Sequence, residues 1–495
     1  MNRRHFCKSA LAAGAAAALP GSVLSAGYQA MMQALSDVPA TTVAGEETVL
    51  ETAALNELRQ SLRGSLLTPG SGAYDTARML WNGMIDKHPA LIARCSGAAD
   101  VAHAVDFARE RNLLVAVKGG GHSFSGKSSC DGGMMIDLSG MDGVRIDPNG
   151  KTGRVEPGVL GGSFDREAQT YGLLTPMGTV SHTGASGLTL GGGFGRTSRL
   201  HGLACDNLLS VDIVTADGRF LRASEDENAD LFWAIRGGGG NFGVVTSFEY
   251  RLHKAGPMMI GGAVVYPMTA ARDAMDFYVD YESKAPRELL VEPYMMAGPE
   301  GNPAFGFEVC YCGSHTDGEK VLEPLMKFGK PIENHIGVKS YMELQTGADE
   351  ALRHGQRNYI KSGFMAGITD GFTEDMLNNY EGHPSMWIFV MHTGGAISDV
   401  AEDATAFAHR GAKGNLLVGG TWQDPAEDEA NIARIRAYWK EVSDHVGGYY
   451  VNLDNEDLKG VPANYGPNYK RLLEMKNKYD PTNLFRLNSN IKPTA

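Results

Sequence analysis

The sequence predicts an α+β fold divided into two domains, and three observations support this. The chain has 495 residues, which is more than one ordinary hydrophobic core accommodates. Between about residues 257 and 446, longer strand-like segments alternate with amphipathic helical ones, which predicts one large sheet with helices on one side. The 63 glycines cluster in a few loops, which indicates backbone that must approach something closely.

A compact strand–helix–strand pattern begins at residue 90. We predict a strand at 90–95, a helix at 98–111 and a second strand at 113–117. Val101 and Val105 are among the apolar positions of the helix. A glycine-rich loop follows the second strand immediately.

The next pattern predicts a hairpin followed by a helix. Strands are expected at 208–215 and 219–223, joined by an Asp-Gly dipeptide, which is a strong hairpin signal. Ser224 and Glu227 form a capping-box pattern, and we expect them to begin the helix that contains Trp233. A run of four glycines ends this helix.

The second half of the chain contains the segments expected to form the large sheet and its helices. A further helix is predicted at 468–479, ended by Pro481. The expected strands are 258–266, 289–296, 305–312, 386–391 and 415–421, and the expected helices are 270–283, 318–328 and 426–446.

The N-terminal residues are typical of an export signal. Arg3 and Arg4 precede a short alanine-rich apolar run at 10–19, which is too short to span a bilayer. The paired arginines resemble a twin-arginine signal. We therefore predict a signal peptide at 1–26, a lead-in at 27–75, and a periplasmic or secreted protein without a membrane span.

Charge and motif composition exclude two classes of function. The formal net charge is −13, and no Lys/Arg-rich stretch supplies the basic footprint that nucleic acid requires. No CxxC pair, HExxH motif or other spaced His/Cys cluster occurs, so no metal site is predicted.

Three glycine-rich segments could hold an anionic ligand. The first is Lys-Gly-Gly-Gly-His-Ser-Phe-Ser-Gly at 118–126, the second runs from 178 to 195, and the third occupies 236–243. Consecutive glycines let successive backbone N–H groups converge on an anion such as a pyrophosphate. A single histidine beside glycines is more often structural, so His122 alone does not predict a ligand-binding site.

One apparent dinucleotide motif is misleading. Gly238, Gly240 and Gly243 satisfy the pattern GxGxxG, but they follow a predicted helix and precede a β-rich run. The dinucleotide fingerprint requires a strand, then the loop, then a helix. A Rossmann-type NAD site is therefore not expected.

Together the three glycine segments resemble the FAD-binding half of the vanillyl-alcohol oxidase / p-cresol methylhydroxylase (PCMH) superfamily, in its berberine-bridge-enzyme-like branch. The resemblance runs from about residue 76 to the end and is weakest between 256 and 440. Further matching segments follow in the expected order: Gly202-Leu203, Asp206-Asn207, Asp230 to Gly240, Tyr465 to Tyr469 and Tyr479 to Arg486.

The resemblance implies an α+β architecture of two domains. A two-part FAD-binding domain of the PCMH type would occupy 76–255, and a substrate domain with a large antiparallel sheet flanked by helices would occupy 256–455. Residues 456–495 would return to the FAD-binding domain. The implied activity is oxidation of a small organic alcohol, sugar or amine by hydride transfer to FAD, which oxygen or another acceptor reoxidises. The alternative is an exported flavin-binding protein without significant turnover.

The resemblance also implies the cofactor contacts. His122 would carry a single covalent bond to the 8α-methyl group of the flavin, because Val180 stands where some relatives have a second, cysteinyl link. The other implied FAD-binding residues come from the three glycine segments and the C-terminal return: Lys118, Gly119, Gly120, Gly121, Ser123, Gly184, Gly187, Gly191, Val245, Asn468 and Asn488. For the two asparagines, local turn capping is the alternative role.

The catalytic base is where this chain departs from its relatives. Leu453 and Phe194 occupy the two positions at which relatives have a tyrosine. Tyr450 is a nearby candidate, as are Tyr359 and Lys361, which strand alternation places on one face. An amine substrate could instead deliver hydride from the carbon beside its neutral nitrogen without any base.

Overall fold

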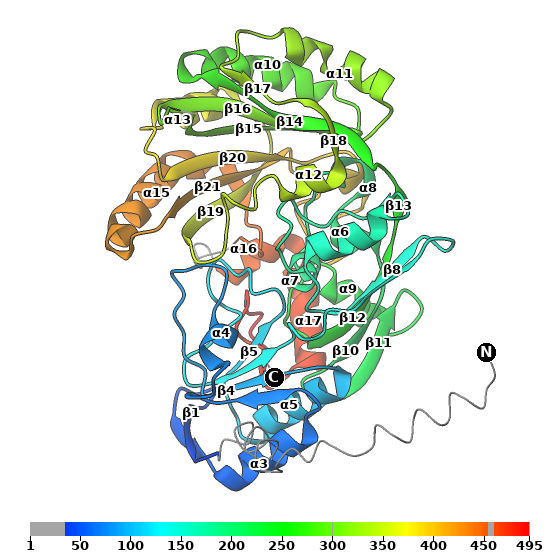
Figure 1. The fold of residues 1–495 in the computed structure, drawn as a ribbon, viewed down its shortest axis with the longest axis vertical. Helices are drawn as coiled ribbons and strands as arrows, with labels where there is room; N and C mark the ends of the chain where they lie inside the picture. Colours follow the sequence, from blue (N-terminus) through cyan, green and yellow to red (C-terminus); the bar gives the residue numbers. More distant parts are fainter. Residues whose placement is uncertain (1–34, 299, 454–459, 495) are drawn as a thin grey trace, which may run out of the picture.

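The computed structural model describes residues 35–298, 300–453 and 460–494, so the predicted signal at 1–26 lies outside the described residues. The molecule has two halves stacked along its long axis (Figure 1). The loop half comprises residues 35–254 and 460–494, and the sheet half comprises residues 258–453. No helix in the described ranges combines the length and apolar character needed to cross a bilayer.

The loop half begins with a four-stranded sheet. Its order is β3-β4-β6-β5, and β4, β6 and β5 run parallel. Helix α5 joins β4 to β5 and buries Val101 and Val105 against the sheet, as the sequence predicts. The bounds are β1 Val38–Thr41, β2 Glu47–Leu50, α3 Thr52–Ser61, β3 Ser65–Leu67, α4 Tyr74–Arg78, β4 Leu91–Arg94, α5 Ala98–Glu110, β5 Val115–Lys118 and β6 Met134–Asp137.

A five-stranded antiparallel sheet, β11-β10-β12-β8-β7, completes the loop half. Helix α7 lies within the second glycine segment, and helix α8 follows that segment. The bounds are β7 Val144–Asp147, β8 Thr152–Val155, α6 Gly161–Gln169, β9 Leu173–Leu174, α7 Ala185–Leu190, α8 Ser198–His201, β10 Leu208–Val214, β11 Phe220–Ser224, α9 Ala229–Ile235, β12 Val244–Arg251 and β13 His253–Lys254.

The predicted hairpin is present, but the predicted capping box is wrong. Ser224 is the last residue of β11, and its Oγ accepts hydrogen bonds from the backbone N–H groups of Asp226 and Glu227 in a turn. Helix α9 begins only at Ala229, after Asn228 with a φ of 47°. The strand therefore extends one residue further than the sequence pattern predicts.

The sheet half is one nine-stranded sheet that confirms the predicted antiparallel architecture. Helices α10, α11, α13 and α15 pack on one face and build the largest hydrophobic core (Figure 1). The bounds are β14 Met258–Pro267, α10 Ala271–Ser283, β15 Leu289–Ala297, β16 Pro303–Tyr311, α11 His315–Lys327, β17 Glu333–Asn334, β18 Gly337–Ser340, α12 Tyr341–Thr346, β19 Arg357–Met365, α13 Asp370–Asn378, β20 Met386–His392, α14 Ala396–Asp399, β21 Gly414–Trp422, α15 Asp428–Val442 and β22 Val446–Gly448.

The C-terminal segment packs back into the loop half. Helices α16 (Val461–Tyr465) and α17 (Tyr469–Tyr479) follow the sheet, and α17 packs against α9 (Figure 1). The fully buried Lys476 pairs with Asp480 at 2.7 Å and donates to the carbonyl oxygens of Asn241 and Phe485. These contacts attach the last residues to the third glycine segment.

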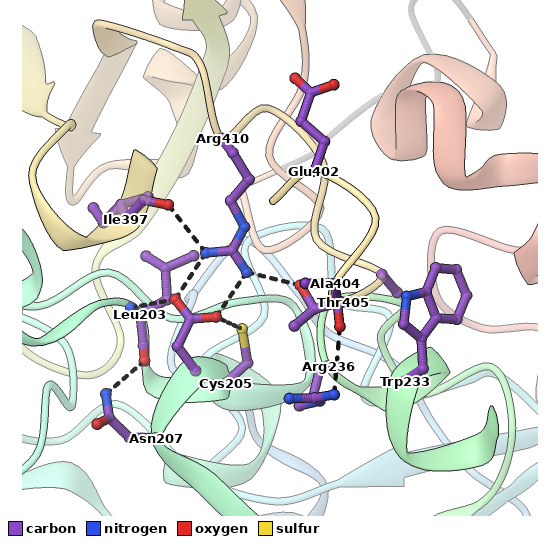
Figure 2. Close-up of polar contacts among 12 residues, drawn as sticks. Leu203, Cys205, Asn207, Trp233, Arg236, Ile397, Glu402, Ala404, Thr405 and Arg410 are labelled. Atoms are coloured by element: carbon purple, nitrogen blue, oxygen red, sulfur yellow. Dashed lines mark hydrogen bonds and ion pairs between the residues drawn. The ribbon is translucent and has the colours of Figure 1, made fainter. Parts of the chain in front are cut away.

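A buried ion pair joins the two halves. Arg410, from the loop before β21, donates from two nitrogens to the carboxylate of Asp206, each at 2.7 Å (Figure 2). The same guanidinium also donates to Thr405 Oγ1. Both side chains of the pair are largely shielded from water. The segment before β21 is therefore held in one position against the half that contains Asp206.

Candidate functional site

A cavity of about 980 Å³ lies between the two halves. The glycine segments of the loop half form one wall. The face of the nine-stranded sheet opposite its four helices forms the other. A pocket of this size at the junction of two halves is the usual setting for a ligand.

The first two glycine segments meet backbone to backbone. A Cβ on Gly120 would lie 2.5 Å from the Cα of Gly184, and a Cβ on Gly119 would lie 2.3 Å from Ser186 Oγ. Gly121 has a φ of +71°, a conformation that side chains rarely adopt. Gly187 has nothing near its Cβ position and borders the cavity. Glycine is therefore required at positions 119 to 121 for the two loops to form this wall, whereas position 187 has room for a side chain.

His122 lies at the cavity with its ring held on two sides. The ring stacks on Trp81 with centroids 4.1 Å apart and planes 14° apart. Its Nε2 lies 3.1 Å from His182 Nδ1. Burial, together with His182 and His354, lowers the pKa of His122 to about 3. The imidazole is therefore neutral at physiological pH and has one unprotonated nitrogen.

Asn488 places an unsatisfied polar atom at the same wall. Its Nδ2 donates to the carbonyl oxygen of Phe485 at 3.0 Å, whereas its Oδ1 is buried and has no partner among the described residues. A buried polar atom without a partner usually marks the place of a ligand or water. Together with the glycine backbones and the neutral His122, it makes a wall that fits a polar dinucleotide.

Nine of the twelve predicted cofactor residues line this cavity. They are Gly119, Gly120, Gly121, His122, Ser123, Gly184, Gly187, Val245 and Asn488.

Three predicted cofactor residues lie elsewhere. Lys118 points away from the cavity and donates from Nζ to the carbonyl oxygen of Ala77 at 2.6 Å. Gly191 approaches Asn452 instead, since a Cβ there would lie 2.1 Å from Asn452 Oδ1. Asn468 donates to the carbonyl oxygen of Glu402 and so supports the loop before Arg410. All three positions have a structural role in the fold.

Tyr359 and Lys361 do not lie in the cavity, which corrects the sequence-based expectation. Both lie on the helix-covered face of the sheet, where Tyr359 accepts a hydrogen bond from Arg436 of α15. Lys361 Nζ lies 5.4 Å from the ring centroid of Tyr359. Strand alternation does place them on one face, but Ile360 between them is the residue that borders the cavity.

Tyr450 does border the cavity, and its catalytic role stays a prediction. Its oxygen accepts hydrogen bonds from the backbone N–H of Gly193 at 3.0 Å and from Asn452 Nδ2 at 2.9 Å. Burial raises the pKa of Tyr450 to about 12. At neutral pH the phenol therefore keeps its proton. The ring also packs edge-on against Phe194.

Aromatic side chains lie flat on the cavity face of the sheet. The ring of Trp387 covers Gly419, whose Cβ would lie 2.3 Å from it, and the ring of Tyr294 covers Gly306 in the same way at 2.4 Å. Phe389 stacks against Tyr294 with centroids 6.3 Å apart. The two glycines make room for the rings, which form an apolar aromatic wall.

Charged side chains also line the cavity on the sheet side, among them Lys339 and Glu343. Within the apolar wall itself lie two carboxylates and one guanidinium that sequence reasoning missed. Glu292 on β15 and Glu308 on β16 are directly opposite each other in the strand register. Arg196 Nη1 donates to Glu308 Oε1 at 2.8 Å, and Glu292 Oε1 accepts from the backbone N–H of His392 at 2.9 Å. Burial and the neighbouring Glu308 raise the pKa of Glu292 to about 8. A glutamate inside the apolar run 289–296 was the signal available in the sequence.

The remaining polar groups do not form a metal centre. Within residues 35–298, 300–453 and 460–494, no group of three or more His, Cys, Asp or Glu side chains could hold a metal ion.

Two segments of the chain match known protein-family models. Residues 89–224 match the FAD binding domain model, and residues 449–492 match the berberine and berberine like model. The chain is 33% identical to an FAD-linked oxidoreductase of Dictyostelium discoideum, over 89% of this chain and 97% of that protein. It is 30% identical to (R)-6-hydroxynicotine oxidase of Paenarthrobacter nicotinovorans, covering 88% and 97%.

The fold has a counterpart among solved structures. The crystal structure of 6-hydroxy-D-nicotine oxidase from Arthrobacter nicotinovorans superimposes with a TM-score of 0.81 at 29% identity. The alignment covers 87% of this chain and 98% of that one. Both halves therefore share their fold with that structure.

Proposed function

The chain belongs to the FAD-linked oxidoreductases of the berberine and berberine-like family, and we propose that it oxidises a small organic alcohol, sugar or amine by hydride transfer to an FAD that His122 binds covalently. The observation that carries this proposal is the cavity of about 980 Å³ that extends from His122 to the aromatic wall of the sheet. Such a cavity can hold a cofactor and a substrate side by side.

The residues of the loop half would hold the cofactor. Gly119 to Ser123 and Gly184 supply closely approaching backbone, and Asn488 supplies the unpaired Oδ1. When bound, FAD supplies an acceptor for two electrons and a hydride. The sheet half would orient the substrate against it and exclude water.

His122 has the properties required of a covalent attachment point. A neutral imidazole keeps a lone pair, and the stack on Trp81 together with the contact to His182 restricts the ring to one orientation. Val180 has no sulfur to offer at the position of the second link, which supports a single bond. Oxygen or another acceptor would complete the cycle.

The absence of the usual tyrosines leaves proton removal to other groups. Leu453 and Phe194 carry no acidic proton, and Tyr450 holds its proton at neutral pH. A substrate whose heteroatom loses its proton to another group of the wall is consistent with this arrangement.

Acid precipitation of the purified protein tests the proposal. The flavin colour should remain with the precipitated polypeptide of the wild type, whereas in the His122→Ala variant the flavin should be extracted into the supernatant. A His182→Ala variant serves as the comparison, because it keeps His122 but removes the contact to its Nε2. A colourless wild-type protein that cannot take up FAD would refute the proposal.

We also propose that the protein is exported through the twin-arginine pathway. Arg3 and Arg4 before the apolar run are the support for this. Replacing both by lysine should retain the protein in the cytoplasm, as measured by fractionation of expressing cells. Export of the double variant at the wild-type level would contradict the proposal.

A further inference from the structure

We propose that Glu292, Glu308 and Arg196 form a site for the positively charged nitrogen of an apolar amine, which makes such an amine the substrate class of this cavity. The inference rests on the proposed function for the reaction that follows binding. It depends on the geometry of the sheet half for the binding itself.

The three side chains form a charge cluster that lacks one positive charge. Glu292 and Glu308 are register partners on adjacent strands, so their side chains point to the same face. One guanidinium, that of Arg196, bonds to Glu308 at 2.8 Å, and its charge also acts on Glu292. Two carboxylates and one arginine leave a net charge of −1, which a buried site tolerates poorly.

Without a ligand, a proton supplies the missing positive charge. Glu308 on the adjacent strand and Arg196 act electrostatically on Glu292, and the backbone N–H of His392 donates to it. The phenol of Tyr278 on α10, on the helix-covered side of the sheet, also lies within electrostatic range. Arg196 is the cation among them, and it is already bonded to Glu308. This balance agrees with the raised pKa of Glu292, which keeps its proton at neutral pH.

The surroundings of the cluster favour an apolar cation over a sugar. Tyr294, Trp387 and Phe389 border the same cavity, and the faces of aromatic rings attract cations. Met296 and Met391 also line the cavity. A sugar would need many hydrogen-bonding side chains, whereas an amine on an apolar body needs one charged partner and an apolar wall.

Binding would exchange one positive charge for another. The ammonium ion enters the cluster, the O–H bond of the Glu292 carboxyl group breaks, and its proton leaves to solvent. The carboxylate of Glu292 then pairs with the ligand nitrogen. No electron is transferred in this binding step, and the cluster keeps a net charge of zero. Before oxidation, the ammonium N–H bond breaks and its proton passes to the Glu292 carboxylate, because only the neutral amine has the lone pair that hydride loss from the neighbouring carbon requires.

Calorimetric titration of the isolated flavoprotein tests this with two probes of nearly equal shape. One is 2-phenylpropan-2-amine, which is protonated at pH 7 and has no hydrogen on the carbon that carries nitrogen, so it binds without being oxidised. The other is the neutral 2-phenylpropan-2-ol. We expect the amine to bind about tenfold more tightly or better. Titrations in two buffers of different ionisation enthalpy should show release of roughly one proton per amine.

Two substitutions in the cluster and one outside it complete the experiment. Glu292→Gln should abolish proton release and bring the amine to within about threefold of the alcohol. Glu308→Gln should also abolish proton release and selectivity for the amine. Arg196 then has no other carboxylate partner, so its charge balances that of Glu292. Glu319→Gln, on the exposed surface of α11, should behave as the wild type.

Three results would overturn the inference: equal binding of amine and alcohol, no proton release, or an unchanged affinity for the amine in both cluster variants. A yellow protein that shows any of them refutes this inference alone. A colourless protein refutes the proposed flavin function instead, so the two failures are distinguishable.

Discussion

The two walls of the cavity are built in different ways. The glycine wall is made of backbone, and its shape depends on side chains being absent, as where Gly120 meets Gly184. The sheet wall is made of side chains such as Glu292 and Trp387, whose positions depend on strand register. Backbone recognition suits a cofactor that is the same throughout a family, whereas side-chain recognition can change with the substrate. The four predictions below test this division.

The largest effect should come from separating the two walls. Arg410→Met leaves the buried Asp206 without its partner, and an unpaired buried charge costs about 3–5 kcal/mol. The free energy of unfolding in urea should fall by that amount. Lys478→Met, which removes the exposed pair with Asp230, should cost less than about 1 kcal/mol. Equal losses in the two variants would contradict the view that Arg410 joins the halves.

Glu292 in the sheet wall should make the free energy of unfolding depend on pH, by about a few kcal/mol. Folded Glu292 keeps its proton up to a pKa of about 8, whereas the unfolded chain loses it near the ordinary value of 4.5. Between these pH values the unfolded state binds fewer protons, so this contribution to stability is present at low pH and is lost as the pH rises through 8. Glu292→Gln should flatten the fall in unfolding free energy by an amount on the order of a few kcal/mol.

Urea titrations at pH 5 and pH 9 measure that slope. The Glu319→Gln variant on α11 is the control, since its carboxylate lies on the helix-covered side of the sheet and is exposed. An unchanged slope in Glu292→Gln would show that the carboxyl group of Glu292 titrates normally.

A smaller loss is expected from one methyl group on the glycine wall. In Gly120→Ala the new Cβ would meet the backbone of Gly184, so the two loops must separate, at about 1–3 kcal/mol. The flavin content measured by absorbance should fall with it. Gly187→Ala, in helix α7 and with nothing near its Cβ, should be neutral or stabilising by up to about 1 kcal/mol. If both substitutions are equally tolerated, the close approach of the loops is not required.

The smallest effect should come from the far face of the sheet. Tyr359→Phe removes the hydrogen bond from Arg436 and should cost about 0.5–1.5 kcal/mol. The rate of flavin reduction under anaerobic conditions should stay unchanged, because Tyr359 is separated from the cavity by the sheet. A large fall in that rate would return Tyr359 to the list of catalytic candidates.

The same division explains what could be predicted from the sequence. Glycine runs and apolar periodicity are local signals, so the first glycine loop, α5 and most strands of the large sheet were found within a few residues. Alternation also placed Tyr359 and Lys361 on one face correctly. It could not say which face, because that depends on where α15 packs.

Nonlocal pairing accounts for the rest. Glu292 becomes informative only when β15 is paired with β16 and Glu308 lies opposite. Lys118 precedes the glycine loop in the chain, yet its position on β5 directs it toward Ala77. The Ser224 pattern failed because the strand continued through the residue expected to cap the helix.

The contacts of the last residues determine when the cofactor site is completed. Phe485 and Asn488 border the cavity together with Gly119, and Lys476 binds the third glycine segment to Phe485. In a nascent chain these residues have not yet been synthesised, so they cannot pack against the glycine wall. Capture of the flavin therefore requires residues 485–488 to have been synthesised, and a chain that stops before Phe485 should be synthesised but never coloured.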